Sequence, residues 1–130
     1  MNYLLALLFL LISITTMASE SVDARASRAK EVENTPVGKA YQHDLWQAIG
    51  AETATLMQEC FPQQSEPDTR SFIFVANVLP NGTSSDAVVH PSTPMAQCFS
   101  SGFSRLHLPI PSDTFGKSGM PLAIEMTVAE

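Results

Sequence analysis

The segment 72–79, Phe-Ile-Phe-Val-Ala-Asn-Val-Leu, constrains the fold of this chain more than any other segment. Its residues are mostly β-branched or aromatic, which is the composition of a strand. Both alternating faces are apolar except at Asn77, and a strand that is apolar on both sides belongs in the interior of a sheet. The sequence therefore predicts a central strand over residues 72–79.

A turn and a second strand follow directly. Pro80, Asn81 and Gly82 form a turn signal, because glycine tolerates positive φ and an Asn-Gly pair favours tight hairpins. Residues 86–90 then return as the partner strand, and Pro91 ends it. We expect an antiparallel hairpin.

Two helices are predicted, one on each side of the hairpin. In residues 41–60 apolar side chains recur at three- and four-residue steps, and Pro62 enforces the end of the helix. Ahead of the second helix, Thr93 is a suitable N-cap and Pro94 suits the first helical position. The apolar stripe of this second helix runs over residues 95–106.

The C-terminal segment 122–128 predicts the last strand. Apolar side chains alternate there with small or polar ones, which gives one buried face and one wet face, and Pro121 at its start fits an edge strand. The buried set is Leu122, Ile124, Met126 and Val128. The order helix, strand, strand, helix, strand predicts an α+β fold, in which a three-stranded antiparallel sheet has two helices packed on one face.

Cys60 and Cys98 are the only cysteines, and one lies on each predicted helix stripe. In an exported chain an even number of cysteines usually forms disulfides, and this bridge would hold both helices on the same face of the sheet. The loop of about 39 residues corresponds to about 4 kcal/mol in the chain-entropy model. Two buried free thiols are the alternative. A metal site is disfavoured, because the histidines are too scattered to give ligand spacing.

The N-terminal residues have the pattern of an export signal. Residues 4–14 are almost entirely apolar, and Thr16 and Ala18 occupy the −3 and −1 positions of a cleavage site. We therefore expect residues 1–18 to be a signal peptide and the protein to be periplasmic or secreted. Because the first three residues carry no Lys or Arg, an uncleaved membrane anchor is the alternative, although a spanning helix needs about 20 apolar residues.

Residues 19–39 are polar, with small side chains and mixed charges. We expect a flexible lead-in there, and a short solvated helix over residues 24–32 is the alternative. The remaining residues, 40–130, are enough for one small domain with a single core.

The charge of the chain excludes two classes of partner. The formal net charge is −6, from 7 Lys and Arg against 13 Asp and Glu. Beyond residue 40 the only basic side chains are Arg70, Arg105 and Lys117. Nucleic-acid binders and proteins attracted to anionic membranes need clustered basic residues, so neither partner is expected.

The order and spacing of the predicted elements resemble the C-terminal domain of the TonB and TolA envelope proteins, over residues 70–128. Three features carry the resemblance. They are the turn at 80–82, the pair Cys98-Phe99 inside the second helix, and the stretch Leu-Pro-Ile-Pro at 108–111 before the last strand.

The resemblance implies protein binding rather than catalysis. Domains of this family add a strand of a receptor segment to the exposed edge of their sheet, and the candidate edge here is the strand that carries Leu122, Ile124, Met126 and Val128. TonB and TolA have long stalks, whereas this lead-in is about 22 residues, at most roughly 70 Å when extended. We therefore expect a non-catalytic protein-binding module of the bacterial envelope, with a protein partner and no membrane insertion after cleavage.

The other functional candidates are weaker. Residues 102–106 resemble half of a nucleophile elbow but lack the closing glycine. Asp86 and His90 are four residues apart on one strand face, where a structural hydrogen bond or solvation is the better interpretation. We therefore predict no enzyme, no cofactor and no metal. The alternative function is a periplasmic inhibitor or immunity-type protein, steered by its acidic charge to a basic enzyme or toxin.

Overall fold

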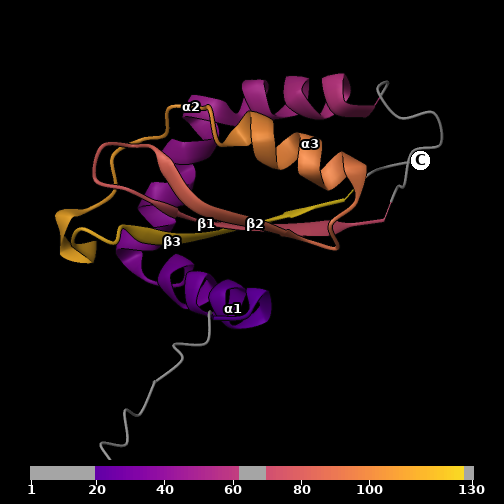
Figure 1. Ribbon diagram of the computed structural model, residues 1–130. Helices are drawn as coiled ribbons and strands as arrows, with labels where there is room; N and C mark the ends of the chain where they lie inside the picture. Colours follow the sequence, from indigo (N-terminus) through magenta and orange to yellow (C-terminus); the bar gives the residue numbers. More distant parts are fainter. Residues whose placement is uncertain (1–19, 62–69, 128–130) are drawn as a thin grey trace, which may run out of the picture.

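A computed structural model describes residues 20–61 and 70–127 (Figure 1). The three strands form one antiparallel sheet with the order β2-β1-β3. Along the chain the elements are α1 (Val22–Glu33), α2 (Pro36–Cys60), β1 (Phe72–Val78), β2 (Ser84–His90), α3 (Pro94–Phe103), the short 3-10 helix η2 (Asp113–Phe115) and β3 (Met120–Met126).

The sheet lies between two helical layers. Helices α2 and α3 cover one face, and α1 lies against the other (Figure 1). The predicted α+β fold is confirmed, as are the central position of β1 and the order helix, strand, strand, helix, strand from α2 onward. The prediction did not include a helix on the second face, and β1 is buried on both sides because α1 is there.

The main core lies between the sheet and the layer of α2 and α3. Phe72 and Phe74 of β1 meet Phe99 and Phe103 of α3, with ring centroids 4.8 to 5.8 Å apart. Each such pair contributes about 0.5–1.5 kcal/mol beyond the burial of its area. Leu45, from α2, is fully buried in the same cluster.

The flexible lead-in predicted for residues 19–39 is wrong, because α1 occupies most of it. The Ser21 hydroxyl caps α1 by accepting the Ala24 N–H at 3.1 Å, which satisfies one of the unpaired amides of the first turn. Ala29 is 0% exposed and lets α1 approach the sheet closely, nearest to β3. The alternative prediction of a short helix agrees better with the structure, although this helix packs against the sheet and is not fully solvated.

Helix α2 begins earlier than predicted, at Pro36 rather than residue 41. The Thr35 hydroxyl accepts the Gly38 N–H at 3.0 Å, and Pro36 takes the first helical position, where its missing N–H costs nothing. The backbone turns sharply here, since a side chain on Gly38 would meet the Val32 carbonyl oxygen. The folded domain therefore starts well before residue 40.

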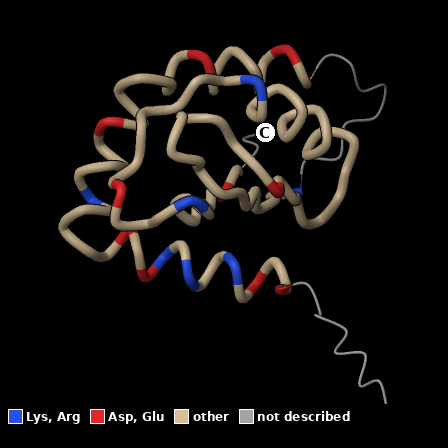
Figure 2. Tube along the Cα trace, turned by 60° about the vertical axis from the view of Figure 1, so that its left-hand side comes forward, with Lys and Arg blue, Asp and Glu red and all other residues tan. Residues whose placement is uncertain are grey.

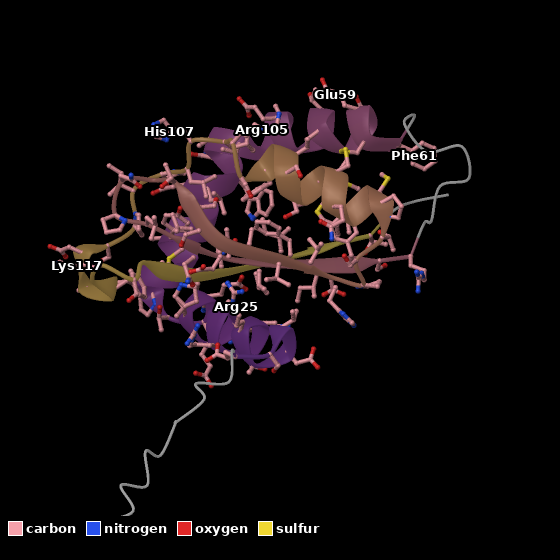
Figure 3. All side chains as sticks on the ribbon, viewed as in Figure 1. Arg25, Glu59, Phe61, Arg105, His107 and Lys117 are labelled. Atoms are coloured by element: carbon pink, nitrogen blue, oxygen red, sulfur yellow. A yellow bond between two sulfur atoms is a disulfide. The ribbon has the colours of Figure 1, made fainter. Side chains whose placement is uncertain are left out.

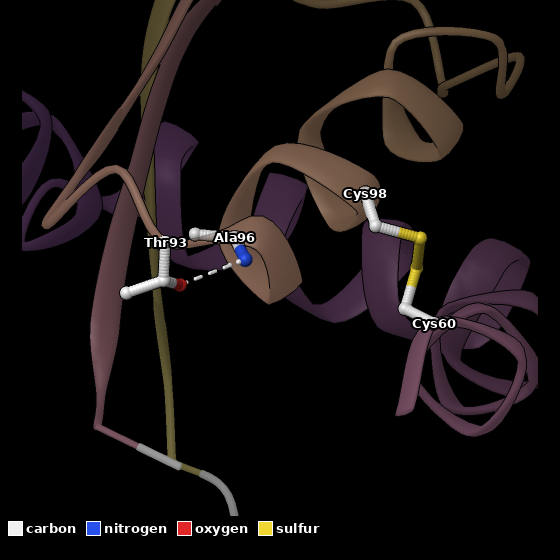
Figure 4. The surroundings of a disulfide bond; sticks show 4 residues. All are labelled: Cys60, Thr93, Ala96 and Cys98. Atoms are coloured by element: carbon white, nitrogen blue, oxygen red, sulfur yellow. Dashed lines mark hydrogen bonds between the residues drawn. A yellow bond between two sulfur atoms is a disulfide. The ribbon is translucent and has the colours of Figure 1, made fainter. Parts of the chain in front are cut away.

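The disulfide predicted between Cys60 and Cys98 is confirmed, with an S–S distance of 2.06 Å and Cα atoms 5.7 Å apart. It joins the last residue of α2 to the middle of α3 (Figure 4). The predicted start of α3 is also confirmed, because the Thr93 hydroxyl accepts the Ala96 N–H at 3.1 Å. The bridge and the cap together fix α3 over the sheet.

Candidate functional site: the outer edge of β3

The two edges of the sheet differ in regularity. In β2 the register with β1 slips between the pairs Val75↔Val88 and Asn77↔Ser85. Asp86 lies in the slipped segment and has a φ of 53°, in the left-handed region. Bulges of this kind twist an edge strand and hinder the addition of another strand.

Strand β3 has no such irregularity. It pairs with β1 without a break from Phe72↔Met126 to Val78↔Met120. Among the described residues, no backbone hydrogen bond joins β3 to a segment on its outer side. The outer side of β3 is therefore the regular edge of this sheet.

The hairpin shows which β3 backbone groups point outward. Leu79 donates its N–H to the Thr83 carbonyl at 2.8 Å, so the backbone groups of Leu79 face β2. Successive residues of a strand face opposite edges, so the even-numbered residues of β1 face β3. Their β3 partners are also even-numbered. It follows that Pro121, Ala123 and Glu125 direct their backbone groups away from the sheet.

These three residues define the outer edge of β3. Ala123 and Glu125 each offer an N–H and a C=O, whereas Pro121 offers only a C=O. A proline is tolerated in a sheet where its missing N–H would face solvent, which agrees with the outward position of Pro121. Glu125 is exposed and Ala123 partly exposed, so α1 leaves this side of β3 accessible.

The side chains predicted as the candidate edge lie mainly in the core. Leu122 and Ile124 are 1% and 4% exposed, and Met126 is partly buried. Val128 lies outside the described residues. These side chains anchor the strand, while the odd-numbered residues between them carry the outward backbone groups. Ala123 and Glu125 were not predicted as site residues, although Pro121 was the sequence signal that identified their side of the strand.

A hollow of about 250 Å³, called here the edge hollow, lies between part of α1 and the face of β3 that α1 covers. The carboxylate of Glu33 accepts a hydrogen bond from the Gln42 side-chain amide at 3.3 Å. Partial burial raises the pKa of Glu33, and the Lys30 ammonium opposes this shift. The residues that line the edge hollow are Ala26, Ser27, Lys30, Glu33, Ile73, Ala123 and Glu125.

The candidate catalytic residues do not come together in a site. His107 is exposed at the outside of the molecule (Figure 3). The Ser104 hydroxyl donates to the Ser100 carbonyl at 2.7 Å, as a helix-terminal side chain does. Asp86 and His90 are both exposed on β2. Within residues 20–61 and 70–127, no three His, Cys, Asp or Glu side chains gather closely enough to hold a metal ion.

No helix in the described part of the chain combines the length and the hydrophobicity needed to span a bilayer. The predicted signal peptide, residues 1–18, lies outside the described residues. Comparison of the chain with protein-family models, with curated proteins and with solved structures found no match.

Proposed function

We propose that this protein is an exported, non-catalytic binding module that adds an extended segment of a partner protein to the outer edge of β3. The observation that carries the proposal is the row of outward backbone groups at Pro121, Ala123 and Glu125 on an edge without a bulge. Unpaired N–H and C=O groups of this kind accept a new strand whatever its sequence.

Two further features support the proposal. The disulfide between Cys60 and Cys98 is the kind of bond that persists in the periplasm or outside the cell. The order of β1, β2, α3 and β3 is also that expected from the resemblance to TonB and TolA C-terminal domains, which bind receptor segments in this way.

The outer edge can supply at most five backbone hydrogen bonds, two each from Ala123 and Glu125 and one from Pro121. A hydrogen bond contributes about 1 kcal/mol net, and the ordering of a peptide opposes that gain. Backbone pairing alone therefore gives a weak complex, and side chains must add to both affinity and specificity.

Proline substitution tests which edge is used. Ala123→Pro removes an outward N–H and puts the proline ring in its place, facing the partner strand. The hydrogen bonds between β3 and β1 remain. Ser84→Pro is the control on β2, because Ser84 pairs with Val78, whose backbone groups face β3, so the backbone groups of Ser84 face out. We expect Ala123→Pro to weaken binding of eight-residue peptides selected by phage display at least tenfold, and Ser84→Pro to leave it unchanged. Circular dichroism and thermal melting check that both variants fold.

The location of binding is read separately by amide NMR shifts, which should move most at Ala123 and Glu125 when peptide is added. If Ser84→Pro abolished binding and Ala123→Pro did not, the edge would be β2 and the proposal wrong. Tight, salt-sensitive 1:1 binding to a basic enzyme that survives Ala123→Pro would favour the inhibitor function instead.

A further inference from the structure

We infer that the partner segment carries a basic side chain, Lys or Arg, at the position opposite Glu125. The inference rests on the proposed function, because it identifies the chemistry of a strand added to the same edge. It makes Glu125 a residue that determines specificity, whereas the backbone of β3 provides pairing with any sequence.

The geometry of the sheet decides where the side chain opposite Glu125 points. Ala123 and Glu125 line the edge hollow, so the odd-numbered side chains of β3 lie on the α1 face. Residues directly opposite in neighbouring strands share a face, with Cβ atoms about 5 Å apart. A strand added outside β3 therefore places one side chain beside the Glu125 carboxylate, at the rim of the edge hollow.

The charges at this rim leave one carboxylate uncompensated. Lys30 is the single basic residue that lines the edge hollow, against Glu33 and Glu125. The ion pair between Arg28 and Glu20 does not involve Glu125, and within residues 20–61 and 70–127 no Lys or Arg forms an ion pair with Glu125. Along α1 the three basic residues, Arg25, Arg28 and Lys30, lie between Asp23 and the pair Glu31 and Glu33 (Figure 2).

Glu125 should favour one sign of charge in the partner side chain opposite it. Opposite charges across a strand pair are favourable and like charges are unfavourable. A partner residue with a Lys or Arg side chain is attracted by Glu125, and an Asp or Glu at the same place is repelled. Ala123, two residues earlier, presents only a methyl group and so accepts a large partner side chain without selecting its charge.

Three defined peptides test the inference. Each has eight residues of alternating Val and Thr, with Lys, Gln or Glu at one central position, and each is titrated into the purified protein by fluorescence anisotropy. We expect the Lys peptide to bind about two- to fivefold more tightly than the Gln peptide, and the Glu peptide to bind more weakly than both. Glu125→Gln should abolish these differences, and Glu125→Lys should invert them.

The control variant is Glu52→Gln, which removes an exposed carboxylate from α2 and should leave the order of the peptides unchanged. Equal binding of the three peptides, with loss of all binding in Ala123→Pro, would overturn this inference and leave the proposed function standing. Preference for Lys that persists in Glu125→Gln would also overturn it. Absence of binding by every peptide would overturn the proposed function together with the inference.

Discussion

Tyr41 shows how one side chain connects the first long helix to a distant loop. Its ring is 6% exposed, and its hydroxyl donates to the Pro109 carbonyl at 2.8 Å. Burial raises the pKa of Tyr41 from 10.0 to about 12, because the charged phenolate is poorly solvated there. The Leu-Pro-Ile-Pro stretch is thus attached to α2 by a bond that requires a protonated phenol.

This attachment predicts a loss of stability in alkaline solution. The folded protein retains the Tyr41 proton up to about pH 12, whereas the unfolded chain loses it near 10, so the contribution is fully present below pH 10 and declines between these values. Urea melts of the wild type should show that decline, and Tyr41→Phe should be flatter over the same range. At neutral pH the variant should be less stable by about 1 kcal/mol, for the lost hydrogen bond. Parallel curves for the two proteins would contradict the role given to this phenol.

At the scale of the elements, the helices and strands whose apolar residues recur with a clear period could be predicted from the sequence. Strand β1, helix α3 and the disulfide between Cys60 and Cys98 follow from such patterns. Helix α1 was expected only as the alternative, and its packing against the sheet was missed, because Ala29 is its one buried residue and small side chains leave no clear apolar stripe. The bulge at Asp86 also has no sequence signal, so the sequence alone does not say which edge is regular.

Close packing of α1 predicts a sharp sensitivity to side-chain size at Ala29. Ala29→Leu places three extra carbons where the helix meets the sheet and should cost about 1–3 kcal/mol. Ala24→Leu, on the exposed side of the same helix, is the matched control and should change stability by less than about 0.5 kcal/mol. Hydrogen exchange should quicken in α1 of the Ala29 variant before it does in β1. Equal thermal midpoints for the two variants would show that α1 is not packed as described.

At the scale of the whole molecule, the disulfide stabilises the layer of α2 and α3. Its cysteines are 38 residues apart, so the chain-entropy model gives about 4 kcal/mol as an upper figure for the bridge. Cys98→Ser should therefore melt well below the wild type in oxidising buffer. In reductant the two proteins should melt together. A wild type that melts equally with and without reductant would mean that the bridge adds nothing to stability.

The covalent ring closed by the disulfide has a definite boundary along the chain. It encloses β1, β2 and the first half of α3, whereas β3 and α1 lie outside it. Tension applied by a bound partner along β3 would therefore load the hydrogen bonds between β3 and β1 and the buried side chains of β3, and the disulfide would not share it. Under such tension, the strand proposed to bind the partner could be pulled from the sheet. The disulfide would still hold the rest of the domain together.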